Sequence, residues 1–132
     1  MNATGEVKAE INSVLRSFGR AVSRRDVQGV MNLFAPDRDI VMLGSEKGER
    51  AYGPRELKKF LERVLSGRAT YSWRWRKQVI SSSGSVAWVT AEGYVTVTRG
   101  KKRKTYPYRM TGVFERRATR WVWLHYHGSE PA

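Results

Sequence analysis

Apolar residues in the first part of the chain recur at helical spacing. From Glu6 to about Val22 they form a single stripe, which predicts an amphipathic helix facing a core: Val7, Ile11, Val14, Leu15, Phe18 and Val22. Asp26 is a favourable N-cap for a second, short helix that runs through Phe34 and ends at Pro36.

A short strand and a third helix are predicted next. Ile40 to Leu43 is an apolar stretch of the kind found in buried strands, and the polar, glycine-bearing segment from Gly44 to Gly53 predicts a loop. Pro54 suits the first turn of a helix, which Gly67 ends. The apolar stripe of this third helix consists of Leu57, Phe60, Leu61, Val64 and Leu65.

The second half of the chain is rich in Val, Thr, Trp and Tyr, which predicts strands. Three short turn segments divide it, so successive strands should pair antiparallel. We therefore expect an α+β fold over residues 1–132, a single domain with the helices on one face of a curved, mostly antiparallel sheet. The four predicted strands are Thr70–Ser81, Val86–Thr98, Thr105–Arg116 and Arg120–His127.

Composition changes this picture in three ways. The absence of cysteine excludes disulfides and thiolate chemistry, and no apolar run approaches the roughly 20 residues that span a bilayer, so we expect no membrane partner. The N-terminus lacks a secretion signal pattern, which predicts a cytoplasmic location. The net charge of +13 attracts anionic partners, yet its basic residues are spread along the chain and are densest only at Arg99–Lys104.

Both histidines lie on the last predicted strand, two residues apart and directly after two tryptophans of the same spacing. On a regular strand Trp121, Trp123, His125 and His127 would share one face. A metal site needs at least a third ligand, and the chain has no other histidine and no cysteine. We therefore expect no metal and no cofactor.

One strand carries a candidate for proton transfer. A regular strand from Ala87 to Val95 places Trp88, Glu92 and Tyr94 on one face and small residues on the other. A glutamate among aromatic rings inside a pocket would have a raised pKa, as general acids and bases often do. The alternative is a glutamate that reaches solvent or pairs with an arginine. Nucleophile-elbow, phosphate-loop and dinucleotide motifs are absent.

The order of these elements and several motifs resemble the nuclear transport factor two-like superfamily, and within it the SnoaL-like, ketosteroid-isomerase-like branch with its cystatin-like fold. The association domain of calmodulin-dependent kinase II is similar too. The resemblance covers nearly the whole chain, and this fold hosts many functions. It is carried by VMNLFAPDRDIVMLG (30–44), YGPREL (52–57), SVAWVTAEG (85–93) and YRMTGVFERRATRWVWLHYHGSEP (108–131).

The resemblance implies a cone in which the sheet wraps a hydrophobic, tyrosine-rich pocket for a small apolar or aromatic ligand. If the chain is an enzyme, the catalytic group would be Glu92. Phe18 and Met42 stand where steroid isomerases of this fold keep their acid–base residues, which argues against that mechanism. The register implied by the family gives these ligand-binding residues: Phe18, Met42, Leu57, Trp88, Tyr94, Tyr108, Met110, Leu124 and Tyr126.

The same register places the tryptophans and histidines of the last strand on the outer face. Two exposed tryptophans form an apolar patch of the kind that marks an association surface, so Trp121, Trp123, His125 and His127 are expected at a homodimer interface. Two alternatives to ligand binding stay open: a non-catalytic association or scaffold domain, and electrostatic binding of nucleic acid.

Overall fold

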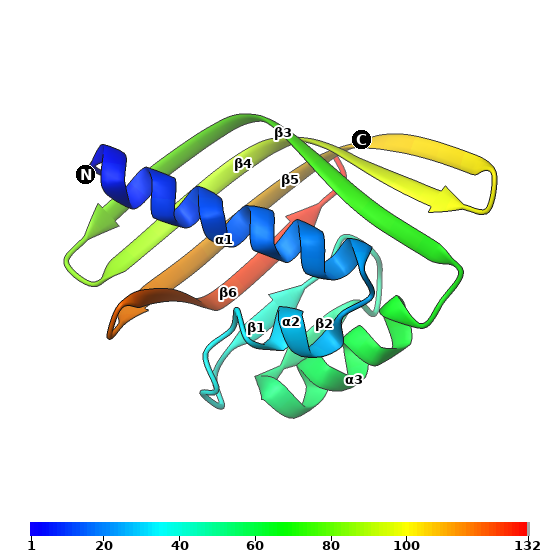
Figure 1. Ribbon diagram of the computed structural model, residues 1–132, viewed down its shortest axis with the longest axis horizontal. Coiled ribbons are helices and arrows are strands. Elements are labelled where there is room, and N and C mark those ends of the chain that lie inside the picture. The colour runs from blue at the N-terminus through cyan, green and yellow to red at the C-terminus, as the bar shows by residue number, and fades with distance from the viewer. Residues whose placement is uncertain (132) are drawn as a thin grey trace.

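The computed structural model describes residues 1–131 and shows three helices and a six-stranded sheet (Figure 1). The predicted helices and the four long strands are confirmed, with ends shifted by a few residues. The elements in chain order are α1 (Gly5–Ser23), α2 (Val27–Met31), β1 (Val41–Leu43), β2 (Arg50–Tyr52), α3 (Gly53–Leu65), β3 (Ala69–Ser83), β4 (Val86–Arg99), β5 (Lys102–Arg117) and β6 (Arg120–Ser129).

The strands lie in the order β2-β1-β6-β5-β4-β3. All neighbours are antiparallel except β1 and β6, which run parallel with Met42 opposite Tyr126. The predicted loop from Gly44 to Gly53 is wrong at its end, because Arg50–Tyr52 turns back and pairs with β1 as β2. Three residues are too few to show an alternating pattern in the sequence.

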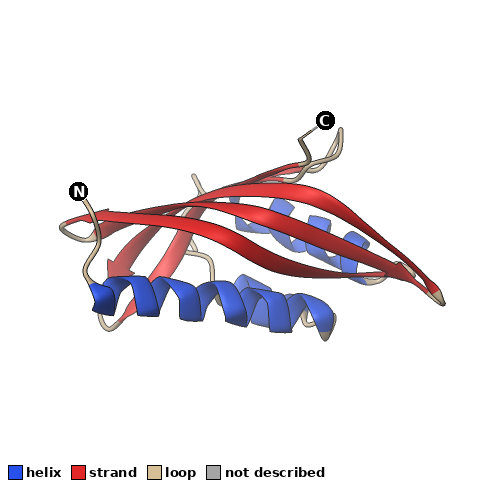
Figure 2. Cartoon of the chain, turned by 90° about the horizontal axis from the view of Figure 1, so that it is seen from above, coloured by secondary structure: helices blue, strands red, loops and turns tan. Residues whose placement is uncertain are grey.

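Two β-bulges interrupt the long strands. Arg76 is an extra residue in β3 between the partners of Gly93 and Glu92, and Leu124 is an extra residue in β6 between the partners of Phe114 and Val113. A bulge bends its strand and increases the local twist. The resulting curved sheet arches over the helices (Figure 2).

The helices have local signals that fix their ends. The Thr4 hydroxyl accepts a hydrogen bond from the Val7 N–H and caps α1, and the Asp26 carboxylate accepts one from the Gly29 N–H and caps α2. Pro54 occupies the first turn of α3, where a missing N–H costs nothing. No helix within residues 1–131 has the length and apolar character needed to cross a membrane.

The core lies between the concave face of the sheet and the helices. Trp123 is fully buried there and contacts Phe18, Phe34 and Phe114, with ring centroids 5.3, 5.4 and 4.7 Å away. Such aromatic contacts bury large areas and favour tilted or offset geometries. The interior is therefore aromatic where α1 crosses the sheet.

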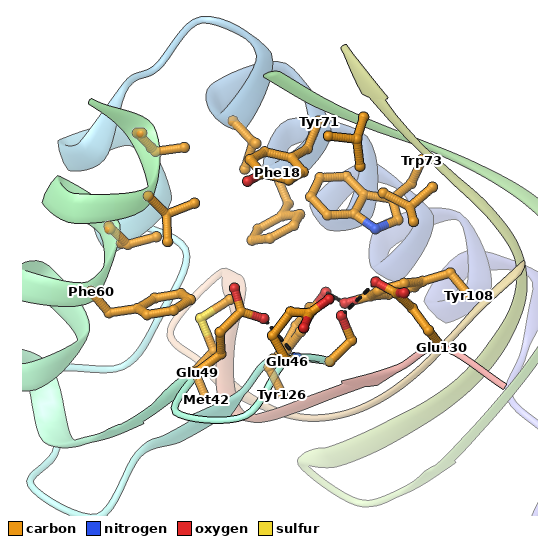
Figure 3. Close-up of a pocket in the computed structure, with 18 of the residues that line it drawn as sticks. Phe18, Met42, Glu46, Glu49, Phe60, Tyr71, Trp73, Tyr108, Tyr126 and Glu130 are labelled. Atoms are coloured by element: carbon orange, nitrogen blue, oxygen red, sulfur yellow. Dashed lines mark hydrogen bonds between the residues drawn. The ribbon is translucent and has the colours of Figure 1, made fainter. Parts of the chain in front are cut away.

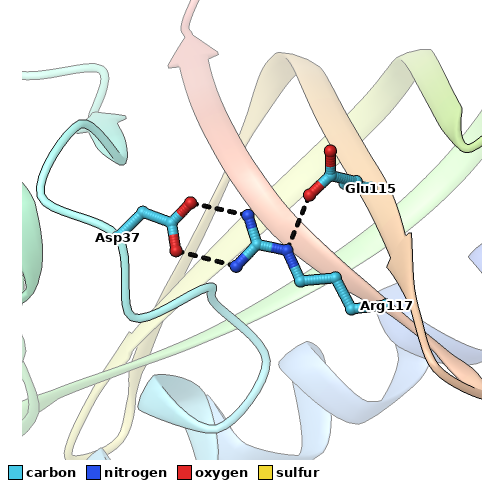
Figure 4. Close-up of polar contacts among 3 residues, drawn as sticks. All are labelled: Asp37, Glu115 and Arg117. Carbon is cyan, nitrogen blue, oxygen red and sulfur yellow. Dashed lines mark hydrogen bonds and ion pairs between the residues drawn. The ribbon is translucent and has the colours of Figure 1, made fainter.

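Polar contacts attach the helical layer to the end of the sheet. The Arg117 guanidinium donates to both Asp37 carboxylate oxygens, at 2.7 and 2.6 Å, and to Glu115 Oε1 at 2.6 Å (Figure 4). Glu10 of α1 accepts from Arg116 at 2.6 Å and from the Trp121 indole at 3.0 Å. The first contact fixes the segment after α2, and the second fixes the first half of α1.

Candidate functional site

A cavity of about 560 Å³ opens between the curved sheet and helices α1 and α3 (Figure 3). Aromatic side chains from both layers form much of its wall, together with aliphatic residues of α3 and the end of β4. Side chains therefore do not fill the cone. The aromatic residues of the wall are Phe18, Phe60, Tyr71, Trp73, Tyr106, Tyr108 and Tyr126.

Two tyrosines place a hydrogen-bonded pair of hydroxyls in this cavity. Tyr108 of β5 and Tyr126 of β6 are 6% and 2% exposed, and their Oη atoms lie 2.8 Å apart. Burial raises the pKa of Tyr108 to about 12, with the Glu49 and Glu130 carboxylates adding to the rise. Burial and the neighbouring Tyr108 also raise the pKa of Tyr126 well above its usual value. Both hydroxyls are therefore protonated at neutral pH.

The pair has one hydrogen to spare. Two neutral hydroxyls carry two hydrogens, and their mutual bond uses one of them. Within residues 1–131 no other group accepts a hydrogen bond from either hydroxyl. A ligand atom that accepts a hydrogen bond would satisfy the remaining donor.

Gly128 makes room for the pair. It lies on the inner face of β6 opposite Met110, and a Cβ atom at this position would overlap the Tyr108 hydroxyl. The absence of a side chain at Gly128 therefore allows Tyr108 to reach Tyr126.

Carboxylates gather at one end of the cavity. Glu46 and Glu49 come from the segment after β1, and Glu130 follows β6. The two strands run parallel, so both chains leave the sheet at the same edge, and the Ser45 hydroxyl donates to Glu130 Oε1 at 2.8 Å. The sequence prediction missed all three residues. Their proximity depends on the β1–β6 pairing, which the local pattern does not reveal.

Four of the predicted ligand-binding residues line the cavity: Phe18, Met42, Tyr108 and Tyr126. Leu57 instead lies on the buried face of α3 and packs in the core, where it is 1% exposed. Met110 lies against a neighbouring hollow, and Leu124 is the half-buried residue of the β6 bulge.

The predicted face of β4 is wrong. Ala87, Val89 and Ala91 point inward and are buried, so Trp88, Glu92 and Tyr94 lie on the outer face. Small side chains face inward on β4 because the aromatic rings of the adjacent strands occupy that part of the interior. Glu92 pairs with Arg109 at 3.0 Å on the outer surface, which is the alternative that the sequence left open. It cannot act on a ligand in the cavity.

The predicted face of β6 is wrong for two of its four residues. Trp121 and Trp123 point inward, whereas His125 and His127 point outward, because the bulge at Leu124 reverses the alternation between the pairs. Trp121 is 5% exposed and Trp123 is fully buried within the protomer. Neither tryptophan is available to form the expected dimer interface.

A second hollow of about 690 Å³ lies between α1 and β3. Phe18, Trp73 and Tyr126 line both this hollow and the cavity, so these three side chains separate the two spaces. The indole N–H groups of Trp73 and Trp123 are buried without a hydrogen-bond partner within residues 1–131. Met110 belongs to the hollow and Met42 to the cavity.

Comparison with known proteins identifies the class. The chain has the NTF2-like fold: a candidate aromatic ring hydroxylase from Novosphingobium aromaticivorans is similar at 16% identity and a TM-score of 0.85, over 99% of this chain and 93% of the other. A candidate NTF2-like dehydratase from Streptomyces avermitilis is similar at 17% identity and a TM-score of 0.81, over 98% and 99%. A candidate calcium/calmodulin-dependent protein kinase II association domain from Thiobacillus denitrificans is similar at 14% identity and a TM-score of 0.75, over 92% of this chain and 94% of the other.

The family follows from the sequence itself. The model of the SnoaL-like domain matches residues 11–132, and the chain belongs to this family. No curated protein matches the sequence. At these identities the structural neighbours establish the fold alone.

Proposed function

We propose that this protein binds a small, ring-bearing ligand in the cavity and holds a hydrogen-bond acceptor of that ligand against the Tyr108–Tyr126 pair. The observation that carries the proposal is the pair itself: two buried hydroxyls with one hydrogen free, inside an aromatic wall. A ligand oxygen could accept this hydrogen, and a single directed donor within an apolar wall would fix the orientation of the bound molecule.

The size and chemistry of the cavity agree with this ligand class. Ligand pockets have volumes of roughly 300 to 1,000 Å³ and combine apolar walls with a few polar groups that fix orientation. The ring centroids of Phe18 and Trp73 lie 5.3 Å apart, and those of Trp73 and Tyr108 lie 6.1 Å apart in an edge-to-face arrangement. A planar ring could pack against such surfaces. Two structural neighbours are named as candidate enzymes, one an aromatic ring hydroxylase and the other a dehydratase.

A matched pair of probes tests the hydrogen bond. 1-Acetonaphthone has a carbonyl acceptor, and 1-ethylnaphthalene has the same ring and nearly the same shape without one. We expect the ketone to bind about three- to tenfold more tightly, which is the range for one net hydrogen bond. The double variant Tyr108→Phe with Tyr126→Phe should bind both probes equally, because no hydroxyl is then left to donate to the ketone.

The four methionines of the chain supply a simple reporter. In a protein labelled with methyl-¹³C methionine, the Met42 signal reports on the cavity and the Met110 signal on the neighbouring hollow. Tyr94→Phe is the control, since Tyr94 lies on the outer face and should leave both affinities unchanged. Equal binding of the two probes to the wild type would contradict the proposal, as would shifts confined to Met110.

A further inference from the structure

The charge of the residues that line the cavity differs from that of the rest of the molecule. The chain has 25 Lys and Arg residues against 12 Asp and Glu, and its net charge is +13. Among the residues that line the cavity, however, three are acidic, Glu46, Glu49 and Glu130, and the basic side chain is Arg99. The local charge is thus opposite in sign to the surrounding surface.

Among residues 1–131 these carboxylates have no cationic partner. The ion pairs within residues 1–131 involve other acids, namely Glu10, Asp37, Glu92 and Glu115. Glu49 instead accepts from the Glu46 backbone N–H at 2.9 Å, and Glu130 accepts from the Ser45 hydroxyl at 2.8 Å. Both contacts hold a carboxylate in place and leave its charge unpaired.

The polar groups share one end of the cavity. In Figure 3 the carboxylates of Glu46, Glu49 and Glu130 lie on the same side as Tyr108 and Tyr126, and Phe18, Tyr71 and Trp73 lie across from them. The buried tyrosine pair points to a ligand independently of the acids, because it has an unused hydrogen. The acids then decide the charge of that ligand.

We infer that the ligand is an organic cation: a ring-bearing molecule with a protonated amine at its polar end. Its ammonium group would face Glu46, Glu49 and Glu130, and its ring would pack among the aromatic side chains, whose faces also attract cations. A metal ion does not fit, since no group of three or more potential ligands within residues 1–131 is arranged to hold one. This inference rests on the proposed function, because it names the charge class of the same ligand.

Three naphthalene probes of matched size test the inference at pH 7. 1-Naphthylmethylamine is a cation, 1-naphthalenemethanol is neutral and 1-naphthoate is an anion. We expect the Met42 methyl signal to give affinities in that order, with the amine about tenfold tighter than the alcohol, as a few partly exposed ion pairs would provide.

A triple variant, Glu46→Gln with Glu49→Gln and Glu130→Gln, removes the charges and keeps the hydrogen-bond acceptors. It should bring the amine to the affinity of the alcohol. The matched control is Glu92→Gln, which removes a carboxylate from the outer face and should preserve the full preference. If the triple variant does not fold, Glu130→Gln alone should lower the preference about twofold, because Glu130 is exposed and is one of three acids.

The outcomes separate the two proposals. Equal affinities of the amine and the alcohol, or an amine preference that survives the triple substitution, would overturn the cation inference and leave cavity binding intact. Failure of all three probes to shift the Met42 signal would overturn both. A preference for the amine together with equal binding of 1-acetonaphthone and 1-ethylnaphthalene would support the cation and contradict the role of the tyrosine pair.

Discussion

Gly128 is a position where one methyl group would decide the shape of the site. The Gly128→Ala variant places a Cβ where the Tyr108 hydroxyl lies, so the ring must move and the 2.8 Å bond to Tyr126 must break. We expect a loss of about 1 to 3 kcal/mol in the free energy of unfolding, typical of overpacking, measured by urea denaturation.

A second glycine provides the control for this substitution. Gly5 begins α1, and a methyl group added there would meet no other atom within 4 Å, so Gly5→Ala should change neither stability nor probe binding appreciably. A Gly128→Ala variant that kept wild-type stability would show that the Tyr108 hydroxyl is not held where the structure places it.

Residue by residue, the sequence predicts the site only in part. Phe18, Met42, Tyr108 and Tyr126 are predicted to face inward and do so, because a helical stripe or a regular stretch of strand connects each of them to the core. Glu92 is misplaced because the implied register of β4 is shifted by one residue, which exchanges the two faces of a strand. The sequence does not predict the three carboxylates at one end of the cavity, because residues 46 and 130 come together only through the long-range pairing of β1 with β6.

At the scale of elements, the bulges explain the misassigned tryptophans. An alternating pattern predicts faces only while the strand stays regular, and Leu124 looks like any other strand residue in the sequence. The short β2 escapes prediction for a related reason, because its pairing with β1 is a tertiary contact. The helices are predicted well because caps, Pro54 and apolar spacing are all local signals.

The Asp37–Arg117 contact between the α2–β1 segment and the end of β5 predicts a pH dependence. Hydrogen bonds from the Arg117 guanidinium hold the pKa of Asp37 below its ordinary value of 3.8. The ionised carboxylate therefore stabilises the folded state above about pH 3.8, and this contribution is lost as the pH falls through the lower pKa of the folded protein.

The Asp37→Asn variant should accordingly have a Tm a few degrees below that of the wild type at pH 7. The difference should shrink below about pH 4 and vanish once Asp37 of the wild type is protonated. Thermal unfolding between pH 2 and 7 measures it. Asp39→Asn is the control, because Asp39 is exposed and forms none of the ion pairs within residues 1–131. A constant difference across this range would show that Asp37 acts through packing rather than charge.

At the scale of the whole molecule, positively charged side chains greatly outnumber the negatively charged ones. A net charge of +13 repels itself, and the hairpin between β4 and β5 extends beyond the helical layer with Lys101, Lys102 and Lys104 exposed (Figure 1). Raising NaCl from about 0.01 to 0.15 M shortens the screening length from about 30 to 8 Å. We therefore expect Tm to rise with salt, as measured by calorimetry.

A variant with Lys101, Lys102 and Lys104 replaced by Gln has three fewer positive charges. Its Tm should depend less on salt than that of the wild type, because less repulsion remains to be screened. A Tm that fell with added salt in the wild type would mean that the ion pairs, rather than the net charge, dominate the electrostatics of the fold.

The bulges at Arg76 and Leu124 also bear on how the fold can diversify. If Leu124 were deleted, Trp123 and Tyr126 would keep their inward faces, because a regular strand would then alternate correctly through both. The same holds for Trp75 and Gln78 around Arg76. The curvature of the sheet can therefore change while the residues that face the interior stay the same. Single-residue insertions and deletions in these strands offer evolution a way to widen or narrow the cone while the residues that touch its contents stay the same.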